Sequence, residues 1–292
     1  MKVLLLGANG QVGSECRKLI PADSREVLAF TRQQADFSDP DAVFAAVIAA
    51  QPDLVVNACA YTAVDKAESE SEIAHSVNAE SVGAMSRACH ELKIPCIHIS
   101  TDYVFDGTAK TPYCEADTVS PTGVYGASKR AGEAQLLQCN PHSIILRTSW
   151  VFGLHGNNFV KTMLRLGAER DHLGVVADQF GCPTAALDLA NVIVELIVKC
   201  EQGENIEWGV YHCSNQGACS WSEFAVAIFD CAIETGLLNQ RPKVAPISTA
   251  QYPTPAARPA YSVLNCEKLE QLLGRPMPHW HSALKGLCLA LK

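Results

Sequence analysis

The sequence of 292 residues contains no long, uninterrupted apolar segment. The run Val3–Leu6 stops at Gly7, which is too short for the core of a signal peptide. The longest apolar stretch is broken by Asp188, Asn191 and Glu195, which excludes a membrane span there. The formal charge of -8 argues against attraction to nucleic acid or to an anionic membrane. We therefore expect a cytoplasmic protein that has neither kind of partner.

Paired cysteine spacing of the kind that binds structural metal is also missing. The 13 cysteines are scattered, without a C-x-x-C motif, and Cys213 and Cys219 are the closest two. An odd number of isolated cysteines in a large acidic chain is typical of buried thiols in a reducing compartment. The sequence therefore predicts no metal site.

The N-terminal half alternates short apolar runs with helical segments. Runs of this kind are buried on both faces, and their alternation with helices predicts an α/β fold with a Rossmann-type, doubly wound parallel sheet. Asp39 and Pro40 predict a helix start, as an N-cap followed by a proline in the first turn. Strands are expected at 3–6, 27–30, 54–57, 94–100 and 143–147, and helices at 11–20, 41–50, 71–92 and 125–138.

The C-terminal half predicts a smaller, partly interleaved substrate lobe. Helices are expected at 161–167, 185–200 and 221–235, with a short strand at 210–213. Five prolines between 242 and 259 predict an extended loop. We assign 1–152 and roughly 185–214 to the dinucleotide-binding domain, and 153–184 and 215–292 to the substrate lobe.

Three glycines follow the first predicted strand and precede a predicted helix. In such a motif Gly7 allows a tight turn, Gly10 lets the backbone approach a pyrophosphate, and Gly13 permits close packing of helix on strand. The phosphates would lie at the helix N-terminus. The expected cofactor contacts in this segment are Gly7, Asn9, Gly10, Gln11, Val12 and Gly13.

The end of the second predicted strand lacks the acidic residue that binds the ribose of NAD. Arg32 lies there instead, which favours the 2′-phosphate of NADPH, although NADH remains possible. Asp36 and Phe37 are expected to flank the adenine. The small residues after the third strand, Ala58, Cys59 and Ala60, leave room for the middle of the cofactor.

Tyr125 and Lys129 are four residues apart, so they share one face of a predicted helix. A neighbouring ammonium favours a phenolate and lowers the pKa of a tyrosine, which suits proton transfer to or from a carbonyl or hydroxyl oxygen. Thr101 ends the fourth strand at the edge where doubly wound sheets bind ligands. His98, inside that apolar strand, is expected to be a core histidine.

Over its full length the chain resembles the extended short-chain dehydrogenase/reductases, and within them the family of dTDP-4-dehydrorhamnose reductases. The glycine turn and the Thr–Tyr–Lys set are typical of the superfamily. Three stretches are specific to the family: Thr62–Glu68, Asp178–Thr184 and Arg258-Pro259.

The resemblance implies reduction of the 4-keto group of dTDP-4-dehydro-L-rhamnose to dTDP-L-rhamnose, a sugar donor for lipopolysaccharide O-antigen. It implies that Tyr125 delivers the proton, that Lys129 lowers the pKa of Tyr125 and binds the nicotinamide ribose, and that Thr101 hydrogen-bonds the keto oxygen. Arg258 is our candidate for the substrate diphosphate. The expected substrate contacts are Val64, Asp65, Ser100, Thr101, Tyr103, Trp150 and Arg258.

Two other functions remain open. A nucleotide-sugar epimerase would keep a tightly bound NAD, and a regulatory subunit would bind NADP without turnover. A dehydratase lacks support because Tyr103 follows Thr101-Asp102 where a glutamate is required. Some family members have a magnesium-linked dimer built from glutamates. Glu15 matches one such position, but Leu187 occupies another, so we expect no Mg²⁺ and a monomer or weak homodimer.

Overall fold

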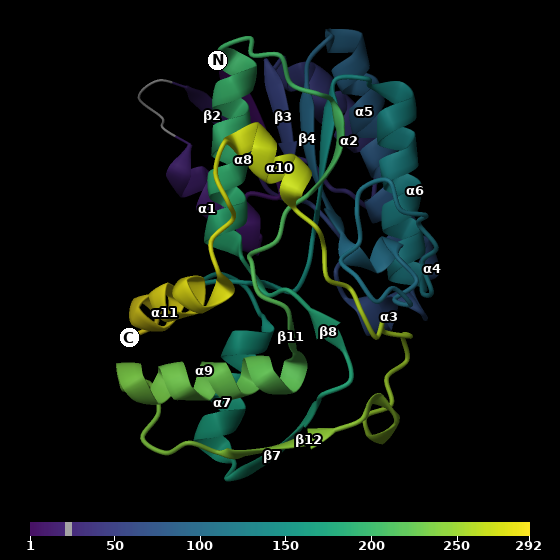
Figure 1. Cartoon of the computed structure of the whole chain (residues 1–292). Coiled ribbons are helices and arrows are strands. Elements are labelled where there is room, and N and C mark those ends of the chain that lie inside the picture. Colours follow the sequence, from purple (N-terminus) through teal and green to yellow (C-terminus); the bar gives the residue numbers. More distant parts are fainter. Residues whose placement is uncertain (21–24) are drawn as a thin grey trace.

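The computed structural model describes residues 1–20 and 25–292, and its upper half in Figure 1 is built on one parallel sheet. Strand order is β10-β5-β4-β3-β1-β2, and every neighbouring pair is parallel. This order confirms the predicted doubly wound fold. The strands are β1 (Lys2–Leu6), β2 (Glu26–Phe30), β3 (Leu54–Asn57), β4 (Cys96–Thr101), β5 (Ser143–Thr148) and β10 (Gly209–His212).

Helices cover both faces of this sheet (Figure 1). Successive residues of β1 face opposite helix layers. Val3 and Leu5 pack against α1 and α8, whereas Leu4 and Leu6 pack against α2 and α5. The Asp39 side chain accepts a hydrogen bond from Ala42 N, which confirms the predicted N-cap. The helices are α1 (Gln11–Leu19), α2 (Pro40–Ala50), α5 (Ser81–Leu92), α6 (Val124–Cys139) and α8 (Ala186–Glu201).

The helix predicted over 71–92 is interrupted. α4 (Ser71–His75) passes into a π-helical segment, Ser76–Glu80, before α5 begins. Within that segment the buried Asn78 accepts from Tyr61 N at 2.8 Å and donates to Ser128 Oγ at 3.0 Å. The π-helical turn therefore places the Asn78 side chain where it joins α6 to the loop after β3.

A second lobe lies at the C-terminal edge of the sheet, in the lower half of Figure 1. Its core contains Phe152, Phe224, Phe229 and Trp280. The helices are α7 (Phe159–Glu169), α9 (Trp221–Thr235) and α11 (Trp280–Ala290). Two-stranded pairs complete it: β6 (Val151–Phe152) with β9 (Thr184–Ala185), β7 (His172–Val176) with β12 (Lys243–Ile247), and β8 (Phe180–Gly181) with β11 (Cys219–Ser220).

The prediction of a loop over 242–259 is wrong in part. β12 pairs with β7 in parallel along its whole length, and Pro246 lies opposite Val175. The nitrogen of Pro246 faces away from β7, and no third strand among those described pairs on that side. The proline therefore costs the pair no hydrogen bond. A 3₁₀ turn, Thr249–Gln251, follows, and only the remainder is extended.

We retain the division into two lobes as a proposal. α8 packs on α1, and β10 extends the large sheet beside β5, so the segment 185–214 lies with the N-terminal half. α10 (Glu267–Leu273) places Leu269 in the same apolar cluster, although it belongs to the segment 215–292. None of the described helices is long and apolar enough to cross a bilayer.

α6 packs on the π-helical segment so closely that Gly132 has no room for a side chain. A Cβ at Gly132 would lie 2.0 Å from the carbonyl oxygen of Asn78. We expect Gly132→Ala to lower the free energy of unfolding by about 1–3 kcal/mol, since backbone must shift. The matched control is Gly286→Ala in α11, which meets nothing within 4 Å and should raise stability by about 0.5–1 kcal/mol. Urea unfolding measures both; equal effects would contradict the packing argument.

Candidate active site

The glycine turn connects β1 to α1 at the C-terminal edge of the sheet. Gly7 has a φ of +78°, and a Cβ there would lie 2.9 Å from the backbone of Ala58. A Cβ at Gly13 would lie 2.1 Å from the carbonyl oxygen of Gly7. The first turn of α1 has neither a side-chain cap nor an acidic residue, so its amides can bind a phosphate. This cradle fits the pyrophosphate of a dinucleotide.

Arg32 and Asp36 lie beside this turn. The carbonyl oxygen of Phe30, at the end of β2, accepts the amides of Gly7 and Ala8 at 3.1 Å, so β2 ends against the turn. Arg32 Nε is 3.1 Å from Asp36 Oδ2, and the arginine side chain is 79% exposed. Hydrogen bonds from Ser38, with a smaller effect of Arg32, lower the pKa of Asp36. The Arg32 guanidinium thus lies in solvent beside the turn, paired with Asp36.

That Phe37 flanks an adenine stays a prediction, and most of its side chain is covered by the core. Phe37 is 5% exposed and belongs to the apolar cluster under α2 and α5. The surface beside the turn is left to Arg32 and Asp36. In the sequence, one apolar residue after Asp36 does not indicate that its side chain faces the core.

Ala58 and Cys59 adjoin the glycine turn. Ala58 N donates to Leu6 O at 3.0 Å, which holds the segment against β1. Burial raises the pKa of the Cys59 thiol to about 12, so the thiol is neutral beside the proposed cofactor path.

Tyr125 and Lys129 occupy the start of α6, and that start is fixed by a carboxylate from another helix. Glu68 Oε1 accepts the amide of Val124 at 2.9 Å, which replaces the missing side-chain cap of α6. Ser128 Oγ donates to the carbonyl oxygen of Tyr125 at 2.8 Å. The sequence contained no sign of the Glu68 contact, since cap and helix are 56 residues apart.

Thr101 and Tyr125 come together at the end of β4. Thr101 Oγ1 donates to Asp102 Oδ1 at 3.0 Å and accepts from Tyr103 N at 3.2 Å. The rings of Tyr103 and Tyr125 meet edge to face at 5.5 Å. Burial raises the pKa of Tyr125 well above its usual range; a hydrogen bond with Thr101 opposes this shift, whereas Asp102 and Tyr103 add to it. The phenol is therefore protonated, as an acid must be before it reacts.

Lys129 does not act on Tyr125 as expected in this structure. It is 1% exposed, and its Nζ donates to the carbonyl oxygen of Ile99 at 2.7 Å and lies 3.3 Å from His98 Nε2. The predicted lowering of the Tyr125 pKa by Lys129 is absent, because the amine is directed at β4. Burial lowers the pKa of Lys129 itself to about 8, with Glu133 and Cys59 opposing.

A cavity of about 550 Å³ opens between the loop after β3 and the second lobe. Arg258 and Asp65 lie on its wall, joined by a bond of 2.8 Å between Nη2 and Oδ2. Arg258 Nε is buried and has no hydrogen-bond partner in the described part of the chain. Arg258 thus keeps an unused donor. The apolar side of the cavity is lined by Phe159, Met163, Leu166, Leu173, Val175 and Trp221.

The other predicted substrate residues lie next to residues of the cavity wall or next to Thr101 and Tyr125. Trp150, at a φ of +47°, stacks on Trp221 at 3.4 Å, and Trp221 lines the cavity. Burial raises the pKa of Tyr103 to about 12, against the effect of the nearby Arg258. Ser100 is buried, and its hydroxyl has no partner within the residues that the structure describes. Val64 begins α3 (Val64–Ala67), next to Asp65.

Sequence reasoning missed several polar or aromatic residues on the wall of the cavity. Three of them come from parts of the second lobe where no motif marked them, and only the tertiary fold brings them to Asp65. They are Arg170, Trp221 and Tyr252.

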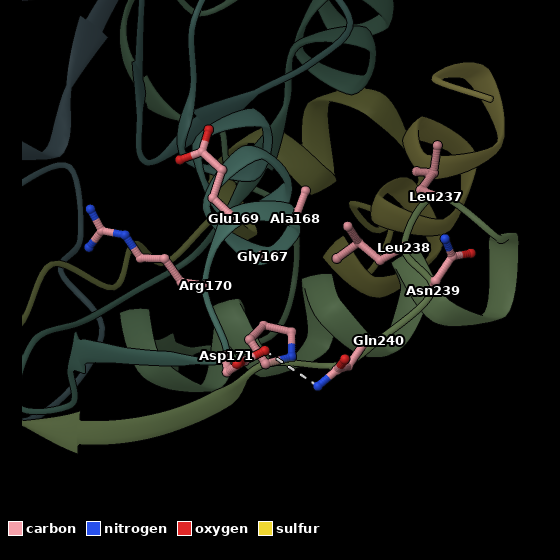
Figure 2. A pocket seen from close by; sticks show the side chains of 10 residues that line it. Gly167, Ala168, Glu169, Arg170, Asp171, Leu237, Leu238, Asn239 and Gln240 are labelled. Carbon is pink, nitrogen blue, oxygen red and sulfur yellow. Dashed lines mark hydrogen bonds between the residues drawn. The ribbon is translucent and has the colours of Figure 1, made fainter.

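A second cavity, of about 280 Å³, lies at the end of α7 (Figure 2). Asp171 and Gln240 join across it at 3.4 Å, and Figure 2 shows Arg170 directed away from Leu237 and Leu238. It contains none of the predicted site residues and takes no part in the candidate site.

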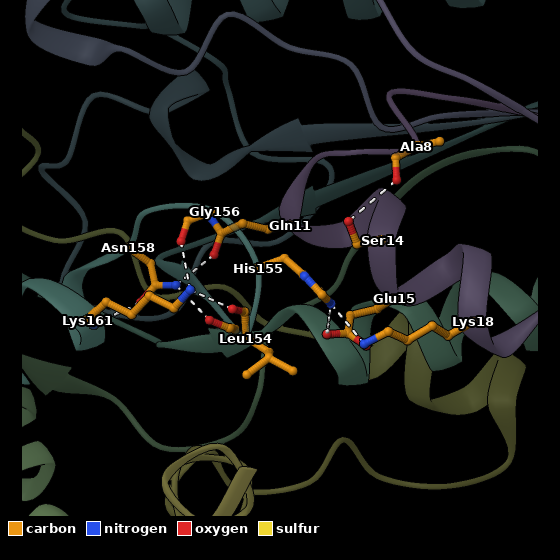
Figure 3. Close-up of polar contacts among 11 residues, drawn as sticks. Ala8, Gln11, Ser14, Glu15, Lys18, Leu154, His155, Gly156, Asn158 and Lys161 are labelled. Atoms are coloured by element: carbon orange, nitrogen blue, oxygen red, sulfur yellow. Dashed lines mark hydrogen bonds and ion pairs between the residues drawn. The ribbon is translucent and has the colours of Figure 1, made fainter. Parts of the chain in front are cut away.

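The loop before α7 joins the second lobe to α1 (Figure 3). Asn158 Nδ2 donates to Gln11 Oε1 at 3.0 Å. Glu15 lies 3.6 Å from His155 Nε2 and 3.8 Å from Lys18 Nζ. The Glu15 carboxylate is thus already paired with two side chains of the same chain. Across residues 1–20 and 25–292, no three His, Cys, Asp or Glu side chains form a metal-binding group.

The chain is similar to known proteins along its whole length. The family described as RmlD substrate binding domain matches residues 1–291. A dTDP-4-dehydrorhamnose reductase from Aggregatibacter actinomycetemcomitans is 45% identical over 287 residues, which cover 98% of each chain. This similarity confirms the resemblance inferred from the motifs.

Two solved structures have the same fold. The dTDP-4-dehydrorhamnose reductase from Clostridium acetobutylicum superposes with a TM-score of 0.92 at 40% identity, covering 100% of this chain and 99% of that one. The enzyme from Bacillus anthracis, solved in complex with NADP, gives 0.91 at 37% identity and covers 99% of both chains. By its full-length match and its fold, this chain belongs to the RmlD family, whose relatives named here are dTDP-4-dehydrorhamnose reductases.

Proposed function

We propose that this chain reduces the 4-keto group of dTDP-4-dehydro-L-rhamnose to give dTDP-L-rhamnose. The observation that carries the proposal is the meeting of Thr101 and the protonated Tyr125 at the sheet edge, between the glycine cradle and the large cavity. The full-length similarity to enzymes named for this reaction supports the choice of substrate.

The cofactor would be NADPH, which supplies a hydride to C4 of the sugar when bound. The amides at the start of α1 would hold its pyrophosphate, and Arg32 its 2′-phosphate. The absence of side chains at Gly7 and Gly13 lets the turn pack closely on Ala58 and on the start of α1, which shapes this cradle. Asn9, Gly10, Gln11, Val12, Cys59 and Ala60 complete the proposed contacts.

Tyr125 delivers a proton as the carbonyl oxygen of the substrate becomes an alcohol. The oxygen gains negative charge as C4 is reduced, and the Tyr125 O–H supplies the proton that neutralises it. Thr101 donates a hydrogen bond to the same oxygen and stabilises that charge. Since Thr101 Oγ1 donates to Asp102 in the free protein, this hydroxyl must rotate when substrate binds.

The cavity accommodates the nucleotide part of the substrate. Its apolar wall, which includes Trp221, suits a thymine ring, and the free Arg258 Nε suits the diphosphate. Asp65, held by Arg258, is placed to accept a sugar hydroxyl. Val64, Ser100, Tyr103 and Trp150 are the remaining proposed substrate contacts.

The test is NADPH oxidation with dTDP-4-dehydro-L-rhamnose prepared in situ, followed at the nicotinamide absorbance. We expect sustained turnover and a cofactor that leaves the protein on gel filtration. NAD that stays bound, with interconversion of sugar epimers, would replace the proposal by the epimerase. Cofactor binding without turnover would replace it by the regulatory subunit.

Arg32→Ala tests the choice of cofactor. Loss of the guanidinium should raise KM for NADPH at least about tenfold, because a charge-assisted hydrogen bond contributes roughly 1.5–3 kcal/mol. KM for NADH should change by less than about twofold. Arg165→Ala is the control, another exposed arginine, which lies on α7 and is paired with Glu169. Equal effects on both cofactors would contradict a contact with the 2′-phosphate.

We further propose that the protein works in the cytoplasm as a monomer or weak homodimer without Mg²⁺. The support is the engagement of Glu15 by Lys18 and His155, and Leu187 at the second glutamate position. Sedimentation velocity with and without EDTA tests this, and a dimer lost on chelation would overturn it.

A further inference from the structure

Gln179 directs a buried polar atom into the large cavity. It lies in the stretch Asp178–Thr184, and it is the only side-chain amide on the part of the cavity wall that the structure describes. Its side chain is 5% exposed, and its Nε2 donates to Thr249 Oγ1 at 3.0 Å. No described residue donates to Gln179 Oε1, and this atom is not buried, so it faces the open cavity.

The orientation of this amide is fixed by Asp178. Thr249 Oγ1 lies 2.7 Å from Asp178 Oδ1, and Thr249 N donates to the two carboxylate oxygens at 2.9 and 3.0 Å. These hydrogen bonds lower the pKa of Asp178, so its carboxylate is ionised and only accepts. The single hydroxyl proton of Thr249 therefore goes to Asp178, and its oxygen can only accept from Gln179. Nε2 must face Thr249, which leaves Oε1 for the cavity.

Both partners of the Gln179 amide are anchored by strand pairing. The segment Asp178-Gln179 follows β7, and Thr249 follows β12, which pairs with β7 in parallel. Ala177 N donates to Ile247 O at 2.8 Å, so the pairing continues to within two residues of both side chains. The acceptor is therefore held by regular structure, as precise recognition of a ligand requires.

An acceptor of fixed direction selects a group that can only donate. The hydroxyls of a sugar donate or accept, so either orientation of the amide would suit them. The imide N3–H of thymine or uracil only donates, whereas N3 of cytosine only accepts. Bases are read by hydrogen bonds to this edge while apolar or aromatic side chains contact the ring. Phe159 and Trp221 supply such contacts on the same cavity wall.

We propose that Gln179 is a specificity-determining residue, whose Oε1 accepts the imide N3–H of a thymine or uracil ring. Asp178 and Thr249 are positioning residues, which keep this acceptor facing the cavity. The inference rests on the proposed function, because it names the side chain that reads the base of the same nucleotide. Cytosine would place a second acceptor against Oε1 and is rejected.

The first experiment measures binding of dUDP and dCDP by titration calorimetry with NADP⁺ present. The two nucleotides differ only at positions 3 and 4 of the ring. We expect the wild type to prefer dUDP by at least about tenfold, because a mismatched buried polar pair is costly. Gln179→Met should reduce this preference to less than about twofold, mainly through weaker binding of dUDP. Gln216→Met is the control, since Gln216 is exposed, donates to Glu270 at 3.2 Å and does not line the cavity.

The second experiment repeats the titrations with Thr249→Val. Valine keeps the shape of threonine and the backbone N–H bonded to Asp178, but it has no oxygen to accept Nε2 of Gln179. The amide can then turn Nε2 toward the cavity, where it suits cytosine. We expect the preference for dUDP to fall at least about threefold, with tighter binding of dCDP. A merely structural role of Thr249 would weaken both nucleotides equally and leave the preference unchanged.

Three results would overturn the inference. A preference that stays at the wild-type value in both variants would show that another group reads the base. Equal weakening of dUDP and dCDP in Gln179→Met would show that Gln179 only shapes the wall. Either result, together with turnover in the reductase assay, leaves the proposed function standing. A wild type that binds neither dUDP nor dTDP would overturn both the inference and the proposed substrate.

Discussion

Tyr125→Phe lowers kcat for the sugar reduction by about a thousandfold, while NADPH binding stays within about twofold. The phenylalanine keeps the ring that meets Tyr103 edge to face at 5.5 Å but has no proton to deliver. General acid catalysis by one group contributes about 10²–10⁴ in rate, so the loss falls mainly on kcat. Single-turnover NADPH oxidation measures the chemical step, and NADPH fluorescence measures binding.

The control for this substitution is Tyr211→Phe. Tyr211 is a buried tyrosine on β10 whose hydroxyl donates to Glu207 O at 2.5 Å, away from Thr101 and Lys129. Its loss should reduce stability by about 1 kcal/mol and leave kcat unchanged. If Tyr125→Phe retained more than a tenth of the wild-type kcat, another group would be the acid, and Asp102, whose pKa burial raises to about 6, would be the first to examine.

Sequence was sufficient for the parts of the fold and site that depend on local rules. Strands β1 and β3 are nearly all apolar because both of their faces are covered, and this made them visible. The glycine turn and the four-residue spacing of Tyr125 and Lys129 are equally local. These patterns do not show in which direction a side chain points. The Lys129 amine was therefore expected beside Tyr125, but it contacts His98 and Ile99.

The remaining site residues depend on contacts between distant segments. Glu68 caps α6 across 56 residues, and Asn78 holds Ser128 across 50. Trp221 and Arg170 reach the cavity only because the second lobe folds over the sheet edge. Neither hydrophobic period nor motif spacing encodes such pairs. β12 was missed for a different reason, since an edge strand tolerates the proline that normally ends one.

Glu133→Gln should produce the largest loss of stability, about 3–5 kcal/mol. Glu133 on α6 accepts Nε and Nη2 of Arg147 at 2.9 and 2.7 Å, and both side chains are 5% exposed. Removing one charge leaves a buried guanidinium without its counterion, which costs far more than a surface pair contributes. The guanidinium also lies over the Phe105 ring at 5.2 Å, so the pair joins α6 to β5 and to the segment after Thr101.

The matched control is Glu169→Gln in α7, which breaks an exposed pair with Arg165 and should cost less than about 0.5 kcal/mol. Urea unfolding of both variants, of Arg147→Met, and of Glu133→Gln combined with Arg147→Met, gives a double-mutant cycle for the buried pair. We expect the double variant to be more stable than Glu133→Gln alone, because it removes the unpaired charge. Since the Glu133 charge also favours the Lys129 ammonium, the pKa of Lys129 should fall in Glu133→Gln. A loss no larger than that of the surface control would mean that water reaches this pair, and that α6 is held on the sheet by packing alone.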